Sequence, residues 1–151
     1  MVPSIQRFNV RVYGVVLRQG HLLVSDEVYK GHRLTKLPGG GVELGEGLAE
    51  ALEREFKEEL SLEIAVGEVC YTNPFFQKSA FRDDEQVIAI YFWVKLLEEI
   101  DYPTAITPDF PPKGTETWQQ CRWIPLDALR PEIFTMPIDQ KMVAYLLEEG
   151  A

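Results

Sequence analysis

The sequence predicts an α/β fold in which a mixed β-sheet is covered by helices on both faces. The first observation is a set of stretches rich in apolar and β-forming residues, which we expect to be strands: 9–17, 21–25, 69–76, 87–97 and 120–124. The second observation is a pair of stretches with helical periodicity, 48–60 and 138–148. Strands interleaved with helices in this way form a mixed sheet with helices packed against it.

Length and composition indicate a single domain over residues 1–151. The chain is 46% hydrophobic, which is enough for a sizeable core. Cys70 and Cys121 lie far apart and do not suggest a disulfide framework, so we expect a reduced, cytoplasmic setting. No apolar run has the length of a membrane helix. The net charge of −9 argues against a binder of nucleic-acid polymers, which needs a basic face.

The first elements are punctuated by glycine and proline. Gly20 marks the turn of a first hairpin, and Pro38 ends the strand-like run before it. The segment 37–47, LPGGGVELGEG, holds five glycines and one proline, so we expect an irregular loop there. A glycine-rich loop before a helix resembles a phosphate cradle in outline, with a tight structural turn as the alternative. It matches neither the P-loop nor the dinucleotide-binding pattern.

The helix predicted for 48–60 carries acids inside its apolar face. At about 100° per residue, this face is formed by apolar side chains at positions 48, 51, 52, 56 and 62. Glu55 and Glu59 fall inside that face, and Glu58 falls at its edge. A carboxylate turned toward the protein is costly unless it is paired or bound to a metal, and hard divalent cations prefer oxygen ligands. The alternative is a solvated helix face with ordinary pairs such as Glu53 with Lys57.

The segment 40–62, GGVELGEGLAEALEREFKEELSL, resembles the signature of the Nudix family. Eight positions agree with that motif: Gly40, Glu46, Arg54, Glu55, Phe56, Glu58, Glu59 and Leu62. Ser61 departs from the pattern, because the family usually has a glycine there that ends the helix in the left-handed conformation. Thr35 is a softer difference, since many relatives carry tryptophan at that place. The departure at Ser61 concerns the helix cap and touches no ligand.

The resemblance implies the Nudix fold, an α/β/α sandwich with a mixed sheet, and a metal-dependent pyrophosphohydrolase. It implies that Glu55, Glu58 and Glu59 bind Mg²⁺ or Mn²⁺, with one of them as a candidate base and the Gly40 carbonyl as an additional ligand. Arg54 would brace the carboxylates, and Glu46 would tie the loop to the helix. The stretch 121–129, CRWIPLDAL, also resembles the strand and turn that commonly follow the motif in this family.

The last elements are a short turn of helix at 126–129 and a closing helix at 138–148. We expect Met142, Tyr145 and Leu146 to share the apolar side of that helix. The long loop between Glu98 and Trp118 contains four prolines. Loops of this length are often functional. We expect this loop to border the substrate site and to be more mobile than the sheet.

Further site residues are assigned with alternatives left open. Relatives often supply one more glutamate from such a loop, which makes Glu116 a candidate catalytic residue and Glu85 its rival; the alternative for both is a solvated acid. Two basic residues ahead of the glycine loop could bind phosphate, and two aromatic residues could stack on a base, with surface charge and core packing as alternatives. These substrate-binding candidates are Arg33, Lys36, Phe76 and Trp118.

The activity predicted from these residues is hydrolysis of a nucleoside diphosphate linked to another moiety. Nucleotide sugars, dinucleoside polyphosphates, ADP-ribose and nucleoside triphosphates all fit the motif. The alternative is a non-catalytic module that binds or senses a nucleotide, and an isomerase would need acid–base residues that we do not identify. Because all acids of the motif are present, the enzyme is favoured. The partner expected is a small molecule, and the sequence does not decide between a monomer and a homodimer.

Overall fold

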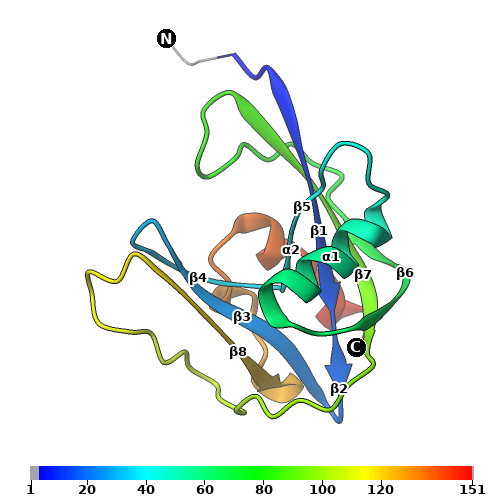
Figure 1. Cartoon of the computed structure of the whole chain (residues 1–151), viewed down its shortest axis with the longest axis vertical. Coiled ribbons are helices and arrows are strands. Elements are labelled where there is room, and N and C mark those ends of the chain that lie inside the picture. Colours follow the sequence, from blue (N-terminus) through cyan, green and yellow to red (C-terminus); the bar gives the residue numbers. More distant parts are fainter. Residues whose placement is uncertain (1–3, 151) are drawn as a thin grey trace. The chain divides into compact units, whose positions relative to one another are not determined.

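The computed structural model describes residues 4–150 (Figure 1). The chain divides into two compact units, formed by Met1–Val15 with Gly39–Glu98 and by Val16–Pro38 with Glu99–Ala151. The first unit contains four strands and a helix: β1 Arg7–Val15, β5 Gly39–Gly41, α1 Leu48–Leu60, β6 Ile64–Thr72 and β7 Glu85–Leu96. The second unit contains β2 Leu17–Arg18, β3 His21–Tyr29, β4 His32–Lys36, β8 Thr117–Pro125, η1 Leu126–Ala128, η2 Pro131–Ile133 and α2 Pro137–Glu148.

The sheet of the first unit is mixed and has the strand order β5-β1-β7-β6. β1 runs parallel to β7 and antiparallel to β5, and β6 runs antiparallel to β7. The helix α1 packs on β1, β5 and β6 (Figure 1). Ala51, Leu52 and Phe56 are the buried side chains of α1. Val12 pairs with Gly40 across the β1–β5 edge, so the glycine loop enters α1 directly from the sheet.

The sheet of the second unit is antiparallel and is organised around β3. That strand pairs with β2 and β4 on one side and with β8 along its full length on the other. A buried ion pair joins two of these strands, with Arg122 Nε 2.6 Å from Asp26 Oδ2. Thr35 on β4 donates to the other oxygen of Asp26 at 2.7 Å. Hydrogen bonds therefore satisfy this buried charge from both neighbouring strands.

The mixed α/β class is confirmed, and both helices and the turn at 126–129 lie close to their predicted positions. The glycine segment is different from the prediction, because Gly39–Gly41 forms a short strand paired with β1 rather than an irregular loop. β3 continues four residues past the predicted end, and β4 follows it as a separate strand. β6 ends at Thr72 rather than at 76, just before the Asn73–Pro74 dipeptide. The residue before a proline is restricted, and proline cannot donate to a sheet.

Two helix faces also need correction. In α2, Met142 and Leu146 are buried as predicted, but Tyr145 is exposed and Val143 is buried in its place. In α1, Leu48 is exposed at the first turn. Both exposed residues are apolar or aromatic. Each shows that the position of a side chain around the helix decides its burial only where another element covers that turn.

The end of α1 explains the effect of Ser61. Its backbone is left-handed, with φ 56° and ψ 37°. The Ser61 N–H donates to the Lys57 carbonyl at 3.1 Å, and the Leu62 N–H donates to the Phe56 carbonyl at 3.3 Å. These two bonds form a Schellman cap, and Phe56 and Leu62 are both buried beneath it. The left-handed cap expected from the family is therefore present, with serine in the strained position.

Replacing Ser61 with glycine should stabilise the protein. A residue with a Cβ pays a steric penalty in the left-handed region that glycine does not pay. We expect Ser61→Gly to increase the free energy of unfolding by about 1 kcal/mol. Urea denaturation of the two proteins measures this difference. An unchanged or lower midpoint for Ser61→Gly would show that the cap carries no strain.

Candidate active site

The candidate site begins where the glycine strand meets the helix. A Cβ added at Gly40 would lie 2.5 Å from the Glu55 carboxyl carbon and 2.6 Å from each of its oxygens. The Glu55 carboxylate therefore lies directly against the backbone of Gly40. Its side chain is only 12% exposed. Only glycine allows this approach, because any other side chain would occupy the space of the carboxylate.

Arg54 connects the carboxylates of the loop and the helix. Its Nε and Nη2 donate to the two oxygens of Glu46 at 2.6 and 2.8 Å. Its Nη1 donates to Glu55 Oε1 at 3.1 Å and to Glu58 Oε2 at 3.2 Å. The second hydrogen of Nη2 is used by the Gly41 carbonyl at 2.9 Å. All five N–H groups of the guanidinium are therefore engaged, and Glu55 and Glu58 meet at a single nitrogen.

Glu46 is the strongest partner of Arg54. It also accepts the Glu43 N–H at 2.8 Å. These bonds favour the ionised carboxylate, so the pKa of Glu46 falls from about 4.5 to about 2, first because of the hydrogen bond from Arg54. The same hydrogen bond raises the pKa of Arg54. The Glu46–Arg54 pair thus fastens the loop to α1.

The contribution of Glu46 to stability should depend on pH. Because its pKa is lower in the folded state, its stabilising effect is present above about pH 4.5 and is lost as the pH falls toward 2. We expect Glu46→Gln to be less stable than wild type at pH 7, with a gap that narrows below pH 4. Chemical denaturation of both proteins at several pH values tests this. A gap that stays constant down to pH 2.5 would contradict the prediction.

The other two glutamates of the motif lie at the surface of α1. The Glu58 side chain is 61% exposed. Glu59 is exposed too, so its predicted place inside the apolar face is wrong. The reason is that burial of α1 ends at Phe56, one turn before its end. Among residues 4–150, no three His, Cys, Asp or Glu side chains already surround a point where a metal ion could bind.

Glu85 lies in the same unit but away from this cluster. It is buried at the start of β7 and accepts from the Asn9 side chain at 3.1 Å. It pairs with Arg7 on β1, whereas Gly40 pairs with Val12. Five residues of β1 separate these positions, which is about 16 Å along the strand. The strand register therefore places Glu85 far from Gly40.

The remaining predicted site residues of the second unit hold the long loop. Arg33 Nη2 donates to the Pro111 carbonyl at 2.9 Å, and its guanidinium lies over the Phe110 ring. Trp118 contacts the same ring, with centroids 5.9 Å apart. Further along the loop, Arg122 donates to the carbonyls of residues 105 and 106 at 2.8 and 3.0 Å. The loop predicted to be mobile is thus attached to its sheet at several points, and its motion stays a prediction.

Lys36 and Glu116 have different surroundings in that unit. Lys36 is buried, and its Nζ lies 3.3 Å from Glu27 Oε2. The side chain of Glu116 is exposed, and its carbonyl accepts the Gly31 N–H at the tip of the β3–β4 hairpin. Phe76 belongs to the first unit and is exposed.

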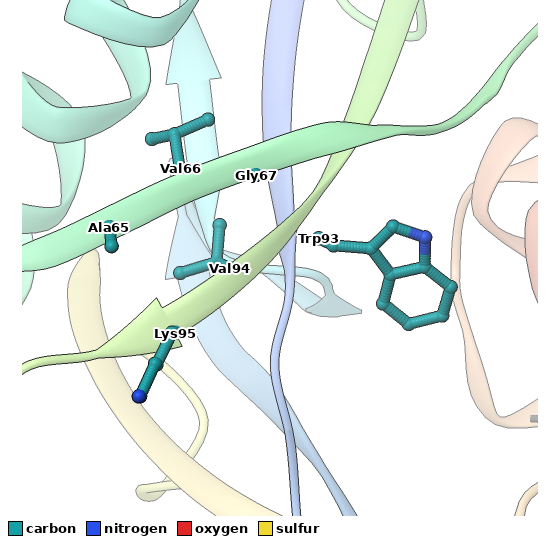
Figure 2. A pocket seen from close by; sticks show the side chains of 6 residues that line it. All are labelled: Ala65, Val66, Gly67, Trp93, Val94 and Lys95. Atoms are coloured by element: carbon teal, nitrogen blue, oxygen red, sulfur yellow. The ribbon is translucent and has the colours of Figure 1, made fainter.

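A hollow of about 280 Å³ lies on β6 and β7 and is separate in composition from the acid cluster. Figure 2 shows Val66 beside Val94, with the Trp93 indole pointing away from them. Lys95 is the single charged residue of its lining, which consists of Ala65, Val66, Gly67, Trp93, Val94 and Lys95. Without a carboxylate, this hollow does not offer the donors that a divalent cation prefers.

Sequence reasoning missed one charged residue beside the glycine strand. Arg11 on β1 pairs with Gly41, and its Nη1 would be 3.8 Å from a Cβ placed at Gly41. Nothing in the strand pattern marks this arginine, because alternation predicts only which face it occupies. The register of β5 against β1 was needed to find it.

A family model for the NUDIX domain matches residues 7–146 of the chain. The chain belongs to the Nudix family. The solved structure of the E. coli ORF135 protein is 20% identical, with a TM-score of 0.67 over 97% of this chain and 93% of that one. A MutT protein from Methanosarcina mazei Go1 is 19% identical, with a TM-score of 0.66 over 95% and 96% of the two chains. An ADP-ribose pyrophosphatase from Streptococcus suis is 17% identical, with a TM-score of 0.56 over 95% and 94%.

These comparisons confirm the Nudix fold and the assignment to a hydrolase family. A comparison with curated protein sequences gives no significant match. At this level of identity, the solved structures show the shared fold alone. Neither helix within residues 4–150 has the length and apolar character needed to cross a membrane.

Proposed function

We propose that this Nudix protein hydrolyses the pyrophosphate bond of a nucleoside diphosphate linked to another moiety. The observation that carries the proposal is the contact between Gly40 and the half-buried Glu55 carboxylate, with Arg54 joining Glu55 to Glu58. A buried acid at the end of a glycine strand is costly in a protein that only needs a stable helix. It is explained if the acid binds a cation during the reaction.

The donor set fits a hard divalent cation. Carboxylates and a backbone carbonyl are the ligands that Mg²⁺ and Mn²⁺ take, and Glu55, Glu58, Glu59 and the Gly40 carbonyl would hold the ion. Glu58 and Glu59 are exposed, so their side chains have room to turn toward Glu55. When bound, the cation supplies charge neutralisation at the pyrophosphate and a more acidic water.

The residues of the chain have separate tasks in this scheme. Arg54 keeps Glu55 and Glu58 together and prevents them from separating by repulsion. Glu46 holds Arg54 in place and does not itself take part in the chemistry. One of Glu55, Glu58 and Glu59 removes a proton from the attacking water. Glu116 is the proposed additional catalytic acid from the loop, since the strand register separates Glu85 from Gly40.

The substrate class is proposed more broadly than one compound. Solved structures of this fold include a protein named as an ADP-ribose pyrophosphatase and one named as a UDP-X diphosphatase. Nucleotide sugars, dinucleoside polyphosphates, ADP-ribose and nucleoside triphosphates are therefore all candidates. Phe76 and Trp118 are proposed to contact the base, and Arg33 and Lys36 the phosphates. We propose that the chain works in the cytoplasm as one Nudix domain on a small molecule, without a membrane or nucleic-acid partner.

Metal binding should stabilise the folded protein. A cation that binds only the folded state shifts the unfolding equilibrium toward it. We expect millimolar Mg²⁺ or Mn²⁺ to raise the melting temperature by a few degrees, whereas the same ionic strength of Na⁺ does not. Differential scanning calorimetry measures both. An identical melting temperature in the two salts would contradict a metal site.

The activity itself is tested with a panel of nucleoside diphosphate derivatives. Release of a nucleoside monophosphate is followed with Mg²⁺ or Mn²⁺ and again with excess chelator. Metal-dependent turnover of at least one derivative supports the hydrolase. Binding of a nucleotide without turnover of any derivative would instead support the non-catalytic module.

A further inference from the structure

Arg11 occupies a special place in the first unit, at the strand that carries the candidate site. It lies on β1 opposite Gly41 of β5. Neighbouring residues of a strand face opposite sides, so Gly40 faces Glu55 on α1 and Gly41 faces the side of Arg11. The carbonyl of Gly41 also accepts from Arg54 Nη2 at 2.9 Å. Gly41 is therefore in contact with one arginine through its carbonyl and faces a second one through its Cα.

The guanidinium of Arg11 is fixed before any ligand binds. Its Nε donates to the Tyr13 hydroxyl at 2.6 Å, and its central carbon lies 5.7 Å from the centre of the Tyr13 ring. Tyr13 is itself stacked on Tyr91, with ring centroids 5.2 Å apart. An arginine held in this way loses little conformational freedom when it binds an anion.

Charge explains what such an arginine could do here. The segment 39–60 carries glutamates at positions 43, 46, 50, 53, 55, 58 and 59. A pyrophosphate approaching this segment needs positive groups in addition to a metal ion. Arg54 cannot provide them, because its five N–H groups already bind Glu46, Glu55, Glu58 and Gly41. Arg11 is a second guanidinium at the same glycine strand.

We propose that Arg11 binds a phosphate oxygen of the substrate beside Gly41. The absence of a side chain at Gly41 leaves the edge of Nη1 uncovered by that residue, which is where an oxygen would approach. Arg11 then orients the pyrophosphate, while the glutamates of α1 hold the cation. This inference rests on the proposed function for the identity of the anion. It assigns to Arg11 a role that the sequence gave to Arg33 and Lys36.

The test uses inorganic pyrophosphate as the probe and two matched arginines. Isothermal titration in Mg²⁺ compares wild type with Arg11→Met, Arg11→Lys and Arg7→Met. Arg7 lies on the same face of β1 about 13 Å away, and its guanidinium is 3.4 Å from Asp84. We expect Arg11→Met to weaken pyrophosphate binding at least about tenfold, as for loss of a charged hydrogen bond. Arg11→Lys should recover part of the affinity, and Arg7→Met should bind like wild type.

Each outcome decides the assignment. Equal affinity in wild type and Arg11→Met, or a similar loss in Arg7→Met, overturns it. Absence of pyrophosphate binding to wild type overturns it as well. With the best substrate, Arg11→Met should raise KM more than it lowers kcat, whereas a general folding defect would lower the active fraction in kcat. If wild type binds pyrophosphate through Arg11 but hydrolyses no derivative, the hydrolase proposal fails and the anion site stands.

Discussion

Glu55→Gln is expected to lower turnover of the best substrate by about a hundredfold or more. The substitution keeps the shape of the side chain but removes the charge that lies against Gly40. The glutamine carbonyl can still accept from Arg54, so the loop and the helix stay connected. Without metal, stability should hold or rise, because one of several repelling carboxylates is gone. The stabilising effect of Mg²⁺ should be lost, since the cation has lost a buried ligand.

Two further variants show whether this loss is specific. Glu53 lies on the exposed face of α1, so Glu53→Gln removes the same charge from the same helix and should leave turnover near wild type. Glu59→Gln should also lower turnover, because that carboxylate must turn toward the cation. Steady-state kinetics and calorimetry with and without Mg²⁺ measure these effects. Wild-type turnover in Glu55→Gln would mean that the Gly40–Glu55 contact is not the active site.

The helix that carries these acids was predictable from local pattern. Its residues 48–60 have a clear apolar period, and the observed bounds are the same. The period also placed Glu55 correctly against the protein. It failed for Glu59, because periodicity describes an endless helix and does not show that burial ends at Phe56. Coverage of a turn depends on which strands lie beneath it, and that is information about the tertiary fold.

Strand register is the second thing that the sequence did not contain. The glycines at 39–41 looked irregular, because glycine has low strand preference and no side chain to alternate. They form a strand because β1 offers a free edge that pairs with them. That pairing puts Gly40 against Glu55 and Gly41 against Arg11. The motif could therefore name the acids of the site but could not name Arg11.

Gly40→Ala should separate activity from folding. The added Cβ would overlap the Glu55 carboxylate, which is the end of a flexible side chain and can move away. We therefore expect a stability loss of about 1 kcal/mol or less, at the low end of the cost of overpacking. Turnover should fall by about a hundredfold, because a carboxylate displaced by about 1 Å no longer holds the cation in the productive place. Thermal denaturation and steady-state kinetics of the same preparation give both numbers.

Gly47→Ala provides the matched control for this displacement. A Cβ at Gly47 would also meet a glutamate, 2.8 Å from Glu50 Oε1 at the start of α1. Glu50 closes the capping interaction of the helix and lies outside the acid cluster. Gly47→Ala should therefore cost some stability through the cap but keep turnover within a fewfold of wild type. Opposite rankings of the two variants in stability and in turnover would show that Gly40 is required for the position of Glu55. A parallel loss of both properties in both variants would show that the loop is needed only for folding.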